Sequence, residues 1–121
     1  MIFNILYALH ALLETVAFVL IFPKGAYPSE SKGEKMVSPT FPGAKGRKRT
    51  HALGLLALAI LGALVLAHGL VDTQTGLIAS QSLLVFHAGC SSLDLASGKR
   101  TYFVHYPFAV GFAAHVVSFY L

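Results

Sequence analysis

Four long apolar runs constrain the fold of this chain more than any other feature of its sequence. They cover residues 2–22, 52–71, 76–96 and 102–121. Each run has about the 20 residues that a helix needs to cross the roughly 30 Å hydrocarbon core of a bilayer. The sequence therefore predicts a single all-α domain, residues 1–121, that forms an integral membrane four-helix antiparallel bundle with both termini on the same side.

The composition and the first run agree with this prediction. Hydrophobic residues make up 55% of the 121 residues and charged residues only 12%, whereas a soluble domain usually carries about 25% charged residues. Run 2–22 has no basic segment before it and contains Asn4, His10 and Glu14, so we expect a retained helix rather than a signal peptide. The single cysteine, Cys90, excludes an internal disulfide and a multi-cysteine metal site.

All nine Lys and Arg residues fall into two segments between the apolar runs. The predicted loop 23–50 carries seven of them against two Glu, and the turn before the last run carries Lys99 and Arg100. With four spans, both segments lie on one side, which the positive-inside rule makes the cytosol or the equivalent matrix or stromal side. This topology explains the net charge of +4 better than nucleic-acid binding does. The alternative is a three-span protein in which the weakly apolar run 76–96 is partly interfacial.

The links between the last three runs are short, so we expect the second helix beside the third and the third beside the fourth. Ala59, Ala63 and Ala67 are spaced four residues apart and offer a stripe of small residues for close helix packing. Pro107 lies in the first turns of the fourth helix, where it either fits the helix start or kinks it slightly.

Four ionisable side chains are predicted to lie at membrane depth, where a functional site is the default hypothesis. His10 and Glu14 are one turn apart on the first helix and share a face with Tyr7. His87 lies near mid-membrane in a polar stripe with Ser80, Ser91 and Asp94, and His115 lies somewhat nearer the termini. These polar faces predict a shared pocket of His10, Glu14, His87 and His115. The competing interpretation is that each residue only orients helices through hydrogen bonds.

The remaining candidates are expected to be peripheral. His51 and His105 are placed near the basic face and His68 near the opposite face. Cys90 is predicted to be a small packing residue, and Asp94 an anchor or cap near the membrane surface. The stretch "GRKRT" (46–50) is expected to set orientation or to attract anionic lipid.

Three function classes fit these residues. The first is a small membrane enzyme that acts on a lipophilic substrate, with Glu14, His10, His87 and His115 as catalytic acids and bases and with no required cofactor or metal. The second is a cofactor-binding subunit, in which His10 and His87 ligate a b-type haem or one histidine ligates chlorophyll or meets a quinone. The third is a non-catalytic accessory subunit of a larger membrane complex. The expected partners are the lipid bilayer, a lipophilic small molecule, and other membrane subunits or further copies of the chain.

Overall fold

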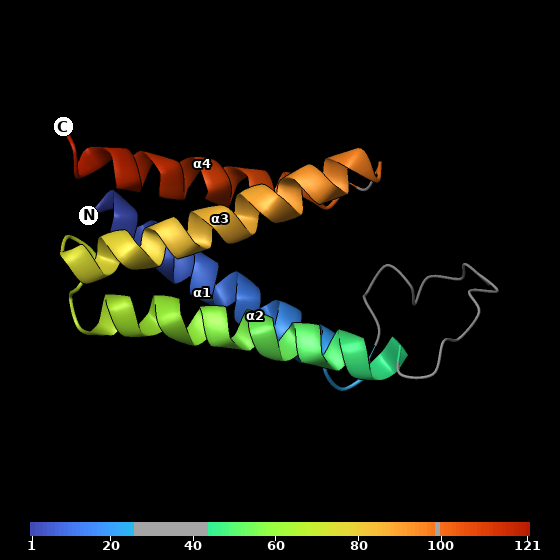
Figure 1. Ribbon diagram of the computed structural model, residues 1–121. Coiled ribbons are helices and arrows are strands. Elements are labelled where there is room, and N and C mark those ends of the chain that lie inside the picture. Colours follow the sequence, from blue (N-terminus) through green and yellow to red (C-terminus); the bar gives the residue numbers. More distant parts are fainter. Residues whose placement is uncertain (26–43, 99) are drawn as a thin grey trace.

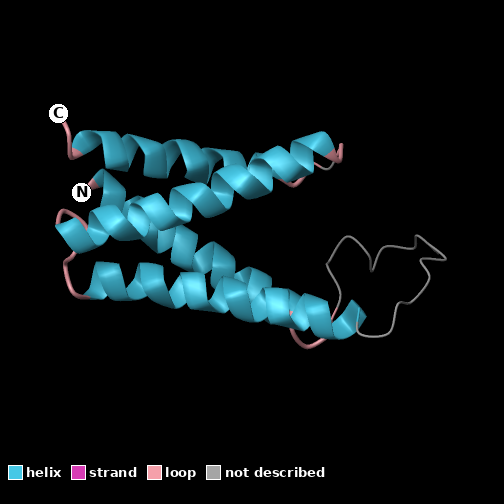
Figure 2. Cartoon of the chain, viewed as in Figure 1, coloured by secondary structure: helices cyan, strands magenta, loops and turns pink. Residues whose placement is uncertain are grey.

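The computed structural model describes residues 1–25, 44–98 and 100–121, and every regular element in this part of the chain is a helix. The cartoon in Figure 2 shows the described chain as helices joined by turns. The prediction of an all-α chain with four helices is confirmed for these residues. The helices are α1 (Ile2–Ile21), α2 (Ala44–Ala67), α3 (Gln74–Ala96) and α4 (Tyr102–Ser118).

The helices form two antiparallel hairpins. α1 packs along α2 and α3 packs along α4, whereas α2 and α3, like α1 and α4, meet only over a short stretch. Figure 1 shows both termini and the α2–α3 turn together at one end, where the hairpins touch, and the hairpins diverging toward the other end. The expected up-and-down order of neighbours is therefore present, but the bundle consists of two pairs, and α2 lies beside α3 only near their turn.

The start of α2 differs from the predicted loop of residues 23–50. The helix begins at Ala44, so the basic stretch 46–50 belongs to its first turns. The guanidinium group of Arg49 donates to the carbonyl oxygens of Phe22, at 3.1 Å, and Pro23, at 3.2 Å. These bonds fasten the beginning of α2 to the end of α1. The part of the predicted loop at 26–43 lies outside the described residues.

Local backbone chemistry explains the other boundaries. α2 ends at Ala67 rather than at residue 71 because Gly69 adopts a φ of 64°, which glycine reaches without a steric penalty. The Leu70 amide then donates to the Val65 carbonyl at 2.8 Å and closes the helix as in a Schellman motif. α3 begins two residues before the predicted start because the Thr73 hydroxyl caps it.

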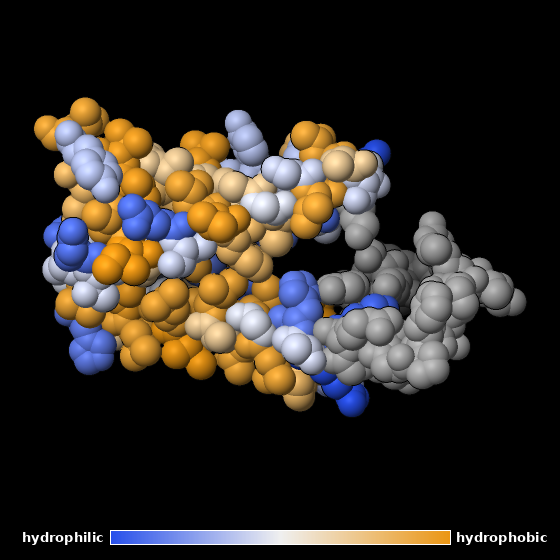
Figure 3. Space-filling view, viewed as in Figure 1, coloured by the Kyte–Doolittle hydropathy of each residue, from blue (hydrophilic) through white to orange (hydrophobic). Residues whose placement is uncertain are grey.

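Large apolar side chains cover the outside of both hairpins, and Figure 3 shows their orange surface along the helices. Three helical segments are long and apolar enough to cross a membrane, namely Ile2–Ile21, Lys48–Ala67 and Gln74–Ala96. α4 has 17 residues, which is the lower end of the range of about 17–25 residues for a spanning helix. Length and composition therefore support three of the four predicted spans.

Polar side chains occupy the centre of the molecule, where the two hairpins meet. The apolar core contains Tyr7, Leu83 and Phe112, each fully buried. Among them lie polar side chains from α1, α3 and α4 that expose 2% of their surface or less: His10, Glu14, Ser80, His87 and His115. Burial of so many polar groups is uncommon in a small fold. Whether each group is hydrogen bonded indicates whether it has a structural role or belongs to a candidate functional site.

Candidate functional site

The carboxylate of Glu14 lies between two imidazole rings. His10 and Glu14 occupy one face of α1, as their spacing predicts, and His87 reaches them from α3. Glu14 Oε1 is 3.7 Å from His10 Nε2 and 3.8 Å from His87 Nε2. One nitrogen or oxygen atom from each residue lies within 4.8 Å of the others. The structure thus brings together three of the four predicted site residues, and we call them the His10–Glu14–His87 group.

The polar atoms of this group are buried without being satisfied. Separations of 3.7 and 3.8 Å are longer than a hydrogen bond. Within the described residues, both ring nitrogens of His10, Glu14 Oε1 and His87 Nε2 have no hydrogen-bond partner. An unpaired buried polar group costs about 1–3 kcal/mol. Several such atoms gathered at one point in the core mark a candidate functional site.

A third histidine, His105, contacts His87 of this group. His87 Nδ1 is 3.1 Å from His105 Nδ1, so one ring donates its N–H to the other. If His87 is the donor, its Nε2 carries a free lone pair directed at Glu14. The sequence prediction placed His105 at the membrane surface, whereas the structure places it half-buried against His87. His105 is therefore a site residue that sequence reasoning missed.

The α3–α4 hairpin contains a signal that could have identified His105. The hairpin turns at Gly98, which has a φ of 66°, and antiparallel helices bring residues at similar distances from a turn near each other. His87 lies eleven residues before Gly98 and His105 seven residues after it, a difference of about one helical turn. The same rule pairs Ser80 with His115, and these two residues are hydrogen bonded.

His115 belongs to a second, separate network. Its Nδ1 is 2.6 Å from Ser80 Oγ, which is 2.7 Å from the Tyr7 hydroxyl. Tyr7 also donates to the Gly76 carbonyl oxygen at 2.9 Å. These bonds join α1, α3 and α4 near the end that holds the termini, and we call them the Tyr7–Ser80–His115 network. The predicted pocket of four residues is thus split, because His115 is engaged elsewhere.

Two glycines have packing roles that the sequence did not reveal. Gly62 on α2 lies against α1, since a Cβ added there would be 3.3 Å from His10 Nδ1. Gly111 on α4 lies against α1, because the atoms nearest to a Cβ added at Gly111 belong to Leu6, the closest at 2.8 Å. The absence of a side chain at Gly62 therefore lets His10 pack close to α2, and its absence at Gly111 lets Leu6 pack close to α4.

The central histidines do not fit a haem. Two axial imidazoles must point at one iron from opposite faces of a flat macrocycle. The His10 and His87 rings instead meet edge to face with centroids 5.0 Å apart. The His87 ring also stacks on Phe108, with centroids 5.2 Å apart and an interplanar angle of 26°. These contacts occupy the space that a porphyrin or a chlorophyll would need beside either ring.

Two hollows on the described surface lie away from the His10–Glu14–His87 group. One measures about 310 Å³ and is bordered by Asp72, Ser118 and Phe119. The other measures about 270 Å³ and lies between α1 and α2, where Ala59 and Ala63 of the small-residue stripe form part of its wall. Neither hollow is lined by Glu14.

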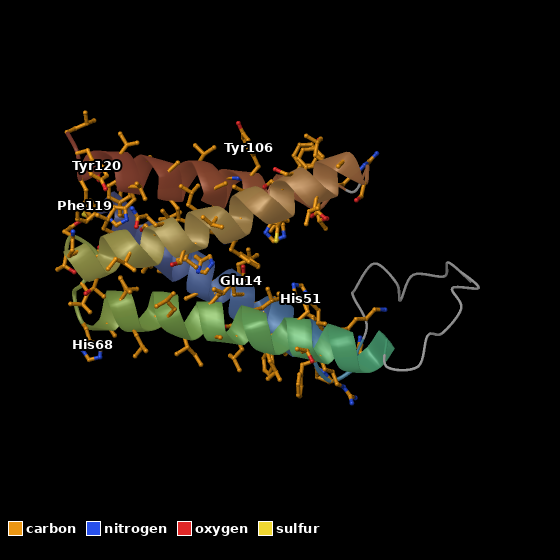
Figure 4. The ribbon with its side chains drawn as sticks, viewed as in Figure 1. Glu14, His51, His68, Tyr106, Phe119 and Tyr120 are labelled. Atoms are coloured by element: carbon orange, nitrogen blue, oxygen red, sulfur yellow. The ribbon has the colours of Figure 1, made fainter. Side chains whose placement is uncertain are left out.

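Glu14 lies near the place where the two hairpins separate. Figure 4 places Glu14 where α2 and α3 part, and His51 on α2 farther along the gap. The space-filling view in Figure 3 shows a hollow between the hairpins in this region. His105 is hydrogen bonded to His87, whose Nε2 is 3.8 Å from Glu14 Oε1. Polar side chains therefore follow one another from His105 through His87 to Glu14.

The other predicted positions are peripheral. His68 is exposed at the end of α2, and Figure 4 shows it on the outer side of that helix. Cys90 is half-buried and not in a disulfide. Asp94 is half-buried near the α3–α4 turn, which agrees with its expected place near one end of the helix.

Comparison of the chain with protein-family models, with curated proteins and with solved structures finds no match.

Proposed function

We propose that this chain is a small integral membrane enzyme that uses the His10–Glu14–His87 group for acid–base chemistry on a lipophilic substrate. The observation that carries the proposal is the position of Glu14 Oε1 between two imidazole nitrogens at 3.7 and 3.8 Å, all buried and unpaired within the described residues. A carboxyl and an imidazole in a water-poor site can serve as acid and base to one substrate. Folding alone gives no reason to keep these groups unsatisfied.

The surroundings support the assignment of roles. Glu14 is the carboxylate that gives or takes a proton, and His10 and His87 are its nearest exchange partners. His105 holds the orientation of His87 and continues the line of polar side chains from Glu14. A lipophilic molecule that enters between the hairpins would meet Glu14 at the point where α2 and α3 part.

The proposal includes a membrane topology. Three helices are long and apolar enough to span, and α4 would be the fourth span, slightly short and followed by Phe119, Tyr120 and Leu121. Both termini lie at one end of the molecule. The described basic residues Lys24, Lys48, Arg49 and Arg100 lie at the α1–α2 and α3–α4 connections. The positive-inside rule then places the end with these two connections on the cytosolic, matrix or stromal side, and the end with the termini on the opposite side.

The test uses mass spectrometry of organic extracts from the detergent-purified chain. Wild type and Asp72→Asn, a neutralised carboxylate at an exposed site outside the helices, are expected to retain the same lipophilic molecule. Glu14→Gln keeps the shape of the side chain but loses the acid, so it should retain an unconverted molecule or none. Identical extracts from all three proteins, or co-purification of other polypeptides without a lipophilic molecule, would overturn the proposal.

A further inference from the structure

We infer that the His10–Glu14–His87 group is a binding site for a divalent transition metal ion of the zinc type. The inference rests on the proposed function in using the same side chains, but it concerns binding and needs no substrate. Two imidazoles and one carboxylate form a ligand set that suits zinc and similar ions, whereas magnesium and calcium prefer oxygen ligands alone. No metal site was predicted from the sequence, in which the single cysteine excludes a multi-cysteine site.

The distances are close to those that a metal requires. Bonds of about 2.0 Å at tetrahedral angles put two ligand atoms about 3.3 Å apart. Glu14 Oε1 is 3.7 Å from His10 Nε2 and 3.8 Å from His87 Nε2. A shift of a few tenths of an ångström in the Glu14 side chain closes this difference for the carboxylate. The His10 and His87 ligand atoms lie within 4.8 Å of each other, so the two rings must approach by up to about 1.5 Å to hold one ion at tetrahedral angles.

The unpaired atoms give independent support. His10 Nε2, Glu14 Oε1 and His87 Nε2 are buried and have no hydrogen-bond partner among the described residues. A metal ion satisfies all three at once. It also links α1 of one hairpin to α3 of the other, where direct helix contact is limited.

His105 has the position of an outer partner to a metal ligand. Histidines that bind metals usually hydrogen bond through their other ring nitrogen, which fixes the tautomer. When His87 Nδ1 is the donor in its 3.1 Å contact with His105 Nδ1, this bond does the same for His87 and leaves its Nε2 free to bind. Three protein ligands leave a coordination position open, as in catalytic zinc sites.

The experiment measures metal binding by the full chain, purified without a polyhistidine tag, stripped with chelator and titrated with Zn²⁺ or Co²⁺. We expect about one ion per chain and a Co²⁺ visible absorption spectrum typical of nitrogen and oxygen ligands. His87→Ala and Glu14→Gln should weaken binding by at least about 100-fold. His105→Ala should weaken it by about 10–100-fold, as loss of an outer partner does.

His68→Ala is the matched control, because His68 is exposed and lies outside the four helices. It should bind like wild type. Circular dichroism of each metal-free variant verifies that it is folded before binding is compared. Wild-type protein that binds no ion, Glu14→Gln that binds like wild type, or binding that depends on His68 instead of His87 would overturn the inference.

The two proposals fail separately. Metal binding without a retained lipophilic molecule upholds the metal site and overturns the enzyme proposal. A lipophilic molecule whose form depends on Glu14, in a chain that binds no ion, overturns the metal site and upholds the enzyme.

Discussion

Two polar groups lie at the interface between the hairpins, and they differ in how far their atoms are satisfied. In the Tyr7–Ser80–His115 network the Tyr7 and Ser80 hydroxyls and His115 Nδ1 are hydrogen bonded, and His115 Nε2 has no partner among the described residues. In the Tyr7–Ser80–His115 network, successive polar atoms are 2.6, 2.7 and 2.9 Å apart. In the His10–Glu14–His87 group, the nearest separations are 3.7 and 3.8 Å. Both groups are almost fully buried, so differences in exposure to water do not explain the contrast.

The contrast separates a structural role from a functional one. A satisfied buried network stabilises and specifies one packing arrangement. An unsatisfied group opposes folding, and such groups are retained where binding or catalysis needs them. The first network therefore joins the hairpins near the termini, and the second group, where the hairpins begin to diverge, is the one for which we propose chemistry or ion binding. The predictions below test this division.

The largest expected effect comes from Gly76, whose carbonyl anchors the satisfied network. A Cβ added to Gly76 would overlap the backbone oxygens of Leu70 and Val71, and a backbone cannot move aside as a side chain can. We expect Gly76→Ala to lose more than about 4 kcal/mol of stability, measured by thermal unfolding with circular dichroism. Gly89→Ala is the control, because an added Cβ there meets no atom within 4 Å, and it should be slightly stabilised. Equal unfolding temperatures for the two variants would contradict the prediction.

A smaller loss is expected when the network is broken without a clash. Ser80→Ala removes the hydroxyl between Tyr7 and His115 and leaves the buried His115 Nδ1 without this partner, while Tyr7 keeps its bond to the Gly76 carbonyl. The loss should be about 1–3 kcal/mol, read from denaturant unfolding in detergent. Ser82→Ala on the same helix removes an exposed hydroxyl that donates to the Ile78 carbonyl of its own helix, so it should change little. If both serine variants unfold alike, the network does not stabilise the fold.

The sequence was sufficient to predict the helices. Runs of about 20 apolar residues and two basic segments gave four helices in an up-and-down order, and the i, i+4 spacing put His10 and Glu14 on one face. These features follow from local chemistry and from chain connectivity, which a single sequence contains.

The pairing of side chains between helices could not be predicted in the same way. The shared pocket of four residues assumed that equal membrane depth implies contact, yet His115 pairs with Ser80 while His105 pairs with His87. Contact also depends on helix rotation and on how the two hairpins cross, which small residues such as Gly62 help to set. Neither quantity can be derived from hydrophobic periodicity alone.

The smallest expected effect on stability, at Glu14, is the sharpest test of the comparison. Glu14 Oε1 has no hydrogen-bond partner in the described part of the chain, so replacing this oxygen removes no bond to it that folding needs. In the presence of chelator, Glu14→Gln should unfold within about 1 kcal/mol of wild type, and Glu14→Leu should be equally stable or more stable, because an apolar side chain of similar size avoids the unpaired buried charge. Paired unfolding curves with Ser80→Ala check this. A loss at Glu14 as large as that of Ser80→Ala would make both groups structural, and the functional assignment of the His10–Glu14–His87 group would then lose its physical basis.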